Sequence, residues 1–170
     1  SLWNIKTING KEVEIVQEME KYKINLLGIS EVKMKGNGIK TLDKNYVMRY
    51  AGVSWNSRAN EGVGIIVTKE TDKYVTSWEA INSRIMSLDL ELEISLTLIQ
   101  VYAPTDNSGA AEKQSFFEEV QKQIEHAEGR QRKVIVMGDL NGRVGNNYQE
   151  AMGCMGRFSG ERTINDNGQR

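Results

Sequence analysis

The sequence contains a single cysteine, Cys154, a single proline and no long run of apolar residues. One cysteine excludes an intrachain disulfide, fits a reducing compartment and offers no zinc-ligand cluster. No apolar run reaches the roughly 18 residues that would span a bilayer, and no secretory leader is recognisable. Neither sign of charge dominates, with 22 Lys and Arg against 23 Asp and Glu. The near-zero net charge therefore argues against binding of nucleic acid by overall electrostatic attraction. It does not exclude binding of phosphate through a metal ion. We expect an intracellular protein without a membrane partner.

What the composition does contain is typical of one globular domain. The chain has 170 residues, of which 39% are hydrophobic and 26% are charged, enough for one domain with one core. Two segments, residues 11–23 and 110–127, have apolar residues at helical spacing and are predicted to bury one face. Val13 belongs to the first apolar face, and Phe117 to the second, with Phe116 packed beside it.

Predicted strands outnumber the helices. Short apolar or alternating runs indicate strands at residues 2–6, 26–29, 46–50, 63–68, 74–81, 86–94, 96–101 and 134–137. Alternation is clearest over residues 86–94, which should place one face on a core and the other towards water. Residues 33–44 are interpreted as a glycine-containing loop. Because hairpins mix with helical crossovers, we predict an α/β (α+β) fold of two packed mixed β-sheets flanked by helices.

Polar side chains follow several of these strands. They are Asn4, Glu31, Tyr102, Asp139 and Asn141. Buried strands fix the residues at their ends rigidly, so such positions suit catalysis. Each residue taken singly is more simply explained as a cap or turn, and Asn141-Gly142 is a common hairpin turn.

The order of short motifs along the chain changes that balance. The motifs are Trp3-Asn4, Ile29-Ser30-Glu31-Val32-Lys33, Gly62-Val63-Gly64-Ile65, Arg84 before a strand, Tyr102-Ala103-Pro104-Thr105 and Gly138-Asp139-Leu140-Asn141. Together they resemble the endonuclease/exonuclease/phosphatase superfamily over essentially the whole chain. Within it, they are most similar to the apurinic/apyrimidinic-type endonuclease domain of non-LTR (LINE-like) retrotransposons and to craniofacial development protein 2-like sequences.

The resemblance implies a four-layered sandwich of the deoxyribonuclease I-like type and a nuclear DNA endonuclease. It implies Mg²⁺ as cofactor, with Mn²⁺ as a substitute, and nicking of target DNA for retrotransposition. By position, Glu31 ligates the metal, and Asn4 beside it holds the metal's water shell or orients Glu31. Asp139 orients or deprotonates the attacking water. Asn141 donates to the scissile phosphate, and Tyr102 points its hydroxyl at the same phosphate. Hard oxygen ligands of this kind are also what Mg²⁺ prefers.

Four further residues are expected near DNA. Lys33 lies in the loop after Glu31, Arg84 matches an arginine of the family, and Asn165 and Asn167 resemble a stretch on the DNA-facing side of the retrotransposon group. The tryptophans Trp55 and Trp78, in contrast, are interpreted as packing residues rather than as base-stacking platforms.

One part of the family pattern is missing. The family closes its site with a C-terminal segment bearing a Ser-Asp-His-like motif, whereas the one histidine here, His126, falls on the polar side of a predicted helix and should be exposed.

We therefore expect residues 1–170 to be the N-terminal three quarters of a single domain from a longer protein, truncated before the final strands. Uncovered strand edges should then favour self-association, and nicking should be weak. Two alternatives stay open, a phosphomonoesterase of the same superfamily and an inactive nuclease fold that binds DNA or protein.

Overall fold

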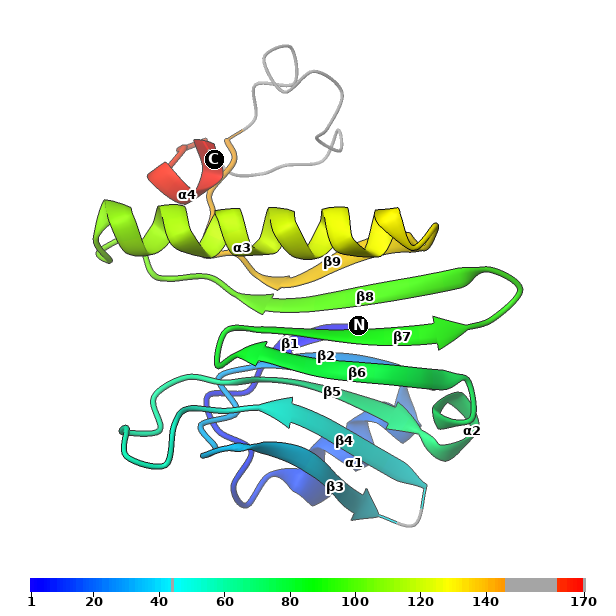
Figure 1. Ribbon diagram of the computed structural model, residues 1–170. Coiled ribbons are helices and arrows are strands. Elements are labelled where there is room, and N and C mark those ends of the chain that lie inside the picture. The colour runs from blue at the N-terminus through cyan, green and yellow to red at the C-terminus, as the bar shows by residue number, and fades with distance from the viewer. Residues whose placement is uncertain (44, 146–161, 170) are drawn as a thin grey trace.

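Two β-sheets pack face to face between helices (Figure 1). The computed structural model describes residues 1–43, 45–145 and 162–169, so Cys154 lies outside the described residues. None of the helices formed by these residues is long and apolar enough to cross a membrane.

The first sheet has five strands in the order β1-β2-β5-β4-β3. They are β1 (Leu2–Asn4), β2 (Leu26–Ser30), β3 (Asn37–Asp43), β4 (Tyr46–Ala51) and β5 (Val63–Thr68). Strands β1 and β2 are parallel, and the helix α1 (Glu12–Lys21) crosses between them. The remaining neighbours in the sheet are antiparallel.

The second sheet has four strands in the order β6-β7-β8-β9. They are β6 (Val75–Asn82), β7 (Ile85–Glu91), β8 (Ser95–Tyr102) and β9 (Lys133–Asp139). The short helix α2 (Lys69–Asp72) links the sheets, and α3 (Ala110–Gly129) is the crossover between the parallel strands β8 and β9. In Figure 1, α3 lies along the outer side of this sheet and α4 (Asp166–Gln169) sits above it.

Three apolar clusters separate four layers. The first lies between α1 and the first sheet, the second between the two sheets, and the third between the second sheet and α3. Valine and leucine at alternate strand positions supply most of the middle cluster, which is why both sheets bury the face they turn to each other. The predicted architecture of two mixed sheets flanked by helices is confirmed.

Local details differ from the sequence prediction where polar residues interrupt the pattern. Residues expected as a loop form the edge strand β3, whose exposed and half-buried positions alternate and carry few apolar side chains. Strand β7 ends at Glu91, because Leu92 and Ile94 lie exposed in the turn to β8. On α3, Phe116 faces the core and Phe117 is only partly buried beside it. Val13 on α1 is exposed.

The carboxyl ends of four strands meet at one edge of the sandwich. In Figure 1, β2, β8 and β9 all point to the left, and β1 runs parallel to β2. The residues that follow these strands therefore come together at this edge, although they are far apart in the sequence.

Candidate active site

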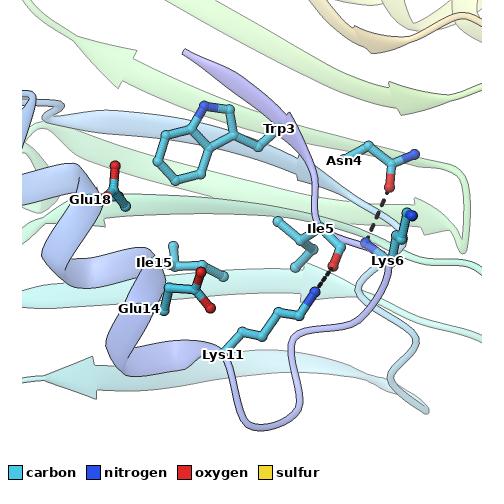
Figure 2. A pocket seen from close by; sticks show the side chains of 8 residues that line it. All are labelled: Trp3, Asn4, Ile5, Lys6, Lys11, Glu14, Ile15 and Glu18. Atoms are coloured by element: carbon cyan, nitrogen blue, oxygen red, sulfur yellow. Dashed lines mark hydrogen bonds between the residues drawn. The ribbon is translucent and has the colours of Figure 1, made fainter.

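Asn4, the last residue of β1, joins two carboxylates that follow strands of different sheets. Its Nδ2 donates to Glu31 Oε1 at 2.7 Å and to Asp139 Oδ2 at 3.3 Å. Its Oδ1 accepts a hydrogen bond from the backbone nitrogen of Lys6 at 3.2 Å, as Figure 2 shows. Because an amide has one oxygen and one nitrogen end, the Lys6 bond aims the nitrogen at the carboxylates. This geometry suits Asn4 to orient the two carboxylates, and the expected place of Asn4 at a metal beside Glu31 stays a prediction.

Glu31 has a backbone conformation that is unusual for a residue other than glycine. Its φ is +58°, and that of Lys33 is +53°. The turn is fixed by its neighbour, since the nitrogen of Val32 donates to the carbonyl oxygen of Gly62 at 3.1 Å. Left-handed conformations of this kind cost energy and cluster at functional sites. The strain at Glu31 supports a functional role for this turn.

The surroundings of Glu31 keep its carboxylate ionised. Partial burial opposes ionisation, but hydrogen bonds from Asn4, Lys33 and Tyr102 outweigh it and hold the pKa of Glu31 below its ordinary value. Lys33 Nζ lies 3.5 Å from Glu31 Oε2, so this lysine, expected at DNA, is paired with the carboxylate.

Tyr102 points its hydroxyl at the same carboxylate. The hydroxyl donates to Glu31 Oε1 at 3.3 Å. Burial raises the pKa of Tyr102, and the negative charge of Glu31 raises it further. The tyrosine is therefore a protonated hydrogen-bond donor at neutral pH.

The exit of β9 places Asp139 and Asn141 beside Tyr102. Asp139 pairs in register with Tyr102, and its Oδ1 accepts from the backbone nitrogen of Asn141 at 3.0 Å. Gly138 permits this close approach, since a Cβ there would lie 2.0 Å from the carbonyl oxygen of Val101. Asn141 Nδ2 donates to the carbonyl oxygen of Ala103 at 2.8 Å. An amide nitrogen carries two N–H donors, so a bond from Asn141 to phosphate stays a prediction.

Arg84, expected at DNA, is tied to groups of the protein itself. Its Nη2 lies 2.6 Å from Glu61 Oε2, and its Nη1 donates to the carbonyl oxygens of Tyr102 and Ala103 at 3.3 and 3.4 Å. The guanidinium carbon is 5.4 Å from the centre of the Tyr102 ring. These contacts favour a supporting role behind Tyr102. Sequence reasoning missed Glu61, which carries no motif apart from the glycine that follows it.

Asn165 and Asn167, the other residues expected near DNA, hold the C-terminal described segment against the site. Asn165 Nδ2 donates to the carbonyl oxygen of Asn141 at 2.8 Å. Asn167 is buried, and its Nδ2 donates to the carbonyl oxygen of Pro104 at 2.8 Å. Direct contact of Asn167 with DNA does not fit this burial.

Two hollows flank Asn4. One, of about 590 Å³, opens beside Asp139 and is lined by Leu2, Asn4, Ser30, Gly138, Asp139, Leu140, Asn141, Gly142 and Arg143. The other, of about 420 Å³, lies between β1 and α1, with Trp3 and Glu18 on its wall (Figure 2). The first hollow borders the Asp139 carboxylate and offers room for a phosphate group.

The donor set at this edge fits a hard divalent cation. Glu31 and Asp139 contribute carboxylate oxygens, and Mg²⁺ commonly takes one or two protein carboxylates and keeps several waters. Within residues 1–43, 45–145 and 162–169, no group of three or more His, Cys, Asp or Glu side chains could hold a metal.

The chain belongs to the Endonuclease/Exonuclease/phosphatase family, whose sequence profile matches residues 2–162. It is 35% identical over 158 residues to craniofacial development protein 2 of Bos taurus. The matched region covers 92% of this chain and 26% of that protein. It is 26% identical over 153 residues to exodeoxyribonuclease III of Haemophilus influenzae, which covers 82% of this chain and 55% of the relative.

A solved structure with the same fold is the AP endonuclease of Leishmania major. The TM-score is 0.65 at 16% identity, covering 86% of this chain and 56% of that one. The predicted family and the deoxyribonuclease I-like sandwich are thereby confirmed. The chain spans about a quarter of the length of craniofacial development protein 2 and little more than half of the other two proteins.

Proposed function

We propose that this chain carries the catalytic cluster of a Mg²⁺-dependent DNA endonuclease. The observation that carries the proposal is the cluster of Asn4, Glu31, Tyr102 and Asp139, joined by hydrogen bonds across the two sheets. Membership of a nuclease and phosphatase family supports hydrolysis of phosphate esters. DNA as the substrate is supported by the likeness to exodeoxyribonuclease III.

The residues divide the work of phosphodiester hydrolysis. A phosphodiester is anionic, so a catalyst must neutralise charge and place a water for attack. Glu31 would hold Mg²⁺ or Mn²⁺, with Asn4 fixing its orientation, and the bound ion would supply positive charge. Asp139 orients the attacking water and accepts its proton. The second amide N–H of Asn141 donates to an oxygen of the phosphate. The single O–H of Tyr102, which donates to Glu31 in the cluster, turns to the phosphate when substrate binds.

The biological setting is part of the same proposal. Resemblance to the endonuclease domain of non-LTR retrotransposons supports nicking of target DNA in the nucleus. Residues 1–170 would then form the N-terminal part of a larger endonuclease domain.

Nicking of supercoiled plasmid tests the proposal directly. We expect weak, Mg²⁺-dependent nicking, which Glu31→Gln and Asp139→Asn reduce by a further 100-fold or so, a typical effect for a group that moves a proton in the transition state. Glu70→Gln, an exposed carboxylate on α2, is the matched control and should leave nicking unchanged. Calorimetric titration with Mn²⁺ should show weaker binding to Glu31→Gln. Unchanged metal binding would contradict the metal assignment.

A second candidate is a nuclease fold that binds DNA without cutting it. The observation in its favour is that His126 is exposed in the last turn of α3, the end of the helix that lies at the right in Figure 1, whereas the strand ends that carry the cluster lie at the left. No other histidine exists in the chain to protonate a leaving group. Metal and DNA binding without any nicking would favour this candidate.

A further inference from the structure

Trp55 is the most exposed large apolar side chain among the described residues, with 73% of its surface open. The sequence interpretation of Trp55 as a packing residue is therefore wrong, whereas Trp78 packs partly buried against the core between the sheets. A single exposed apolar side chain is common on protein surfaces, so what distinguishes Trp55 is how its position is fixed and what lies beside it.

The position of Trp55 is fixed by contacts on several sides. It lies in a tight turn closed by a hydrogen bond from the nitrogen of Ser57 to the carbonyl oxygen of Ser54 at 2.9 Å. Lys35 Nζ donates to the carbonyl oxygen of Trp55 at 2.9 Å. The indole rests against Gly36, whose φ is +67°, and a Cβ there would come within 3.1 to 3.2 Å of three indole atoms. The indole ring thus packs against a position that has no side chain.

The turn is also anchored to the segment that follows Glu31. The nitrogen of Gly36 donates to the carbonyl oxygen of Val53 at 2.8 Å, and the nitrogen of Val53 donates to the carbonyl oxygen of Met34 at 3.1 Å. A side chain held in this way loses little conformational entropy when a ligand covers it. Trp55 is therefore a preorganised surface.

Trp55 lies at the same edge of the sandwich as the candidate active site. Ser30, which precedes Glu31, pairs with Val63 at the start of β5, so the loop from β4 to β5 leaves the sheet at this edge, at the left in Figure 1. A hollow of about 590 Å³ separates the turn from the site. It is lined by Val53, Ser54, Ser57, Arg58, Asn60, Glu61, Ser83, Arg84 and Glu112. Arg84, on its far wall, contacts Tyr102 of the site.

Cations accompany the indole along this edge. Lys35 and Arg58 are both exposed, and Lys33 lies between Lys35 and the site in the chain. A flat aromatic surface beside positive charges matches the chemistry of a nucleic-acid strand, whose bases stack on aromatic rings and whose phosphates pair with cations.

We propose that Trp55 is a stacking platform for an unpaired base of the DNA strand that enters the candidate active site. Lys35 and Arg58 contact the flanking phosphates. The base must be unpaired or displaced, because a base inside a duplex already has neighbours on both faces. This inference rests on the proposed function and adds to it a preference for DNA that contains a gap or single-stranded segment.

Binding measured without cleavage tests the inference separately from catalysis. The probes are a fluorescein-labelled gapped duplex, an oligo-dT strand and a blunt intact duplex, titrated in EDTA. We expect Trp55→Ala to bind the gapped and single-stranded probes about tenfold more weakly, in line with loss of one base–aromatic stack. Binding of the intact duplex should change less than twofold. Trp55→Phe, which keeps an aromatic face, should retain most of the affinity.

The control is Tyr74→Ala, which removes a half-exposed aromatic residue that precedes β6 at the opposite edge and should leave all affinities unchanged. Oligo-dT should also quench tryptophan fluorescence of the parent chain, and this quenching should disappear in Trp55→Ala although Trp3 and Trp78 remain. Equal affinities of parent and Trp55→Ala for the gapped probe would overturn the inference. So would an equal loss on gapped and intact DNA. The plasmid-nicking assay tests the endonuclease proposal separately: nicking that Asp139→Asn does not reduce would contradict that proposal and not this inference.

Discussion

At the scale of single residues, Arg84 is connected to the candidate site through Tyr102 and touches neither of the two carboxylates of that site. Its guanidinium bonds the backbone oxygens of Tyr102 and Ala103, lies over the Tyr102 ring and pairs with Glu61. An arginine fork makes several such bonds at once, which a lysine cannot reproduce. Arg84 thereby fixes where the Tyr102 hydroxyl points, and Glu61 fixes Arg84.

We expect Arg84→Lys to lower kcat for plasmid nicking about tenfold while KM changes little, because the tyrosine loses its support but DNA loses no contact. Steady-state kinetics on a nicking substrate measure both quantities. Glu112→Gln is the control, since Glu112 lies farther from Arg84, at 3.6 Å, and is half exposed. A rise in KM with unchanged kcat would instead mean that Arg84 contacts DNA directly.

At the scale of elements, a buried carboxylate fastens α3 to the second sheet. Asp89 on β7 is 5% exposed and accepts hydrogen bonds from Thr97 Oγ1 at 2.7 Å, Ser77 Oγ at 2.9 Å and Arg130 Nη1 at 2.7 Å. Arg130 caps the end of α3. Burial opposes ionisation of Asp89, but Arg130 and the two hydroxyls outweigh it and hold its pKa below the ordinary value.

We expect Asp89→Asn to lower the free energy of unfolding by about 2 kcal/mol at neutral pH, a typical loss when hydrogen bonds to a buried charged group are removed while the partner Arg130 stays partly exposed to water. Because the pKa of Asp89 is lower in the folded than in the unfolded chain, its charge stabilises the fold above the unfolded pKa. That contribution is lost as pH falls through the folded pKa. The difference between the two proteins should therefore shrink in acid. Urea unfolding of both proteins across the acid range measures it, with Glu70→Gln as an exposed control; a constant difference would contradict the expectation.

Sequence pattern could predict the elements whose signals are local. Strand exits are read from short apolar runs, so Asn4, Glu31 and Asp139 could be singled out before the structure brought them together. The alternation over residues 86–94 predicts that Asp89 faces water. Alternation shows which residues share a face of a strand, but it cannot show that α3 covers that face. The exposure of Trp55 could not be predicted either, since it depends on a turn and on Gly36, which lies 19 residues earlier.

At the scale of the whole molecule, two of the edge strands formed by the described residues carry exposed apolar side chains. Strand β1 ends the first sheet and β9 ends the second. Apolar side chains accompany these edges, with Leu2, Ile135, Val136 and Leu140 each more than a third exposed. Open edges with apolar neighbours recruit further strands, and a second copy of the chain is the nearest source.

We expect the purified 170-residue chain to associate as its concentration rises, and Ile135→Lys to reduce this association, because a charged residue on an edge strand disfavours pairing. Light scattering over a concentration series measures the average mass. Lys133→Arg on the same strand keeps the charge and serves as the control. A monomeric parent chain at every concentration would show that these edges are protected.

The hydrogen bond between Asn4 and Asp139 joins residues 135 positions apart. A ribosome adding roughly 5 to 20 residues per second needs about 7 to 27 seconds to make that stretch. For most of this interval Glu31 has already been synthesised with its partner Asn4, but Asp139 is absent. The newly made chain therefore cannot assemble the complete cluster of Asn4, Glu31, Tyr102 and Asp139 until β9 has emerged.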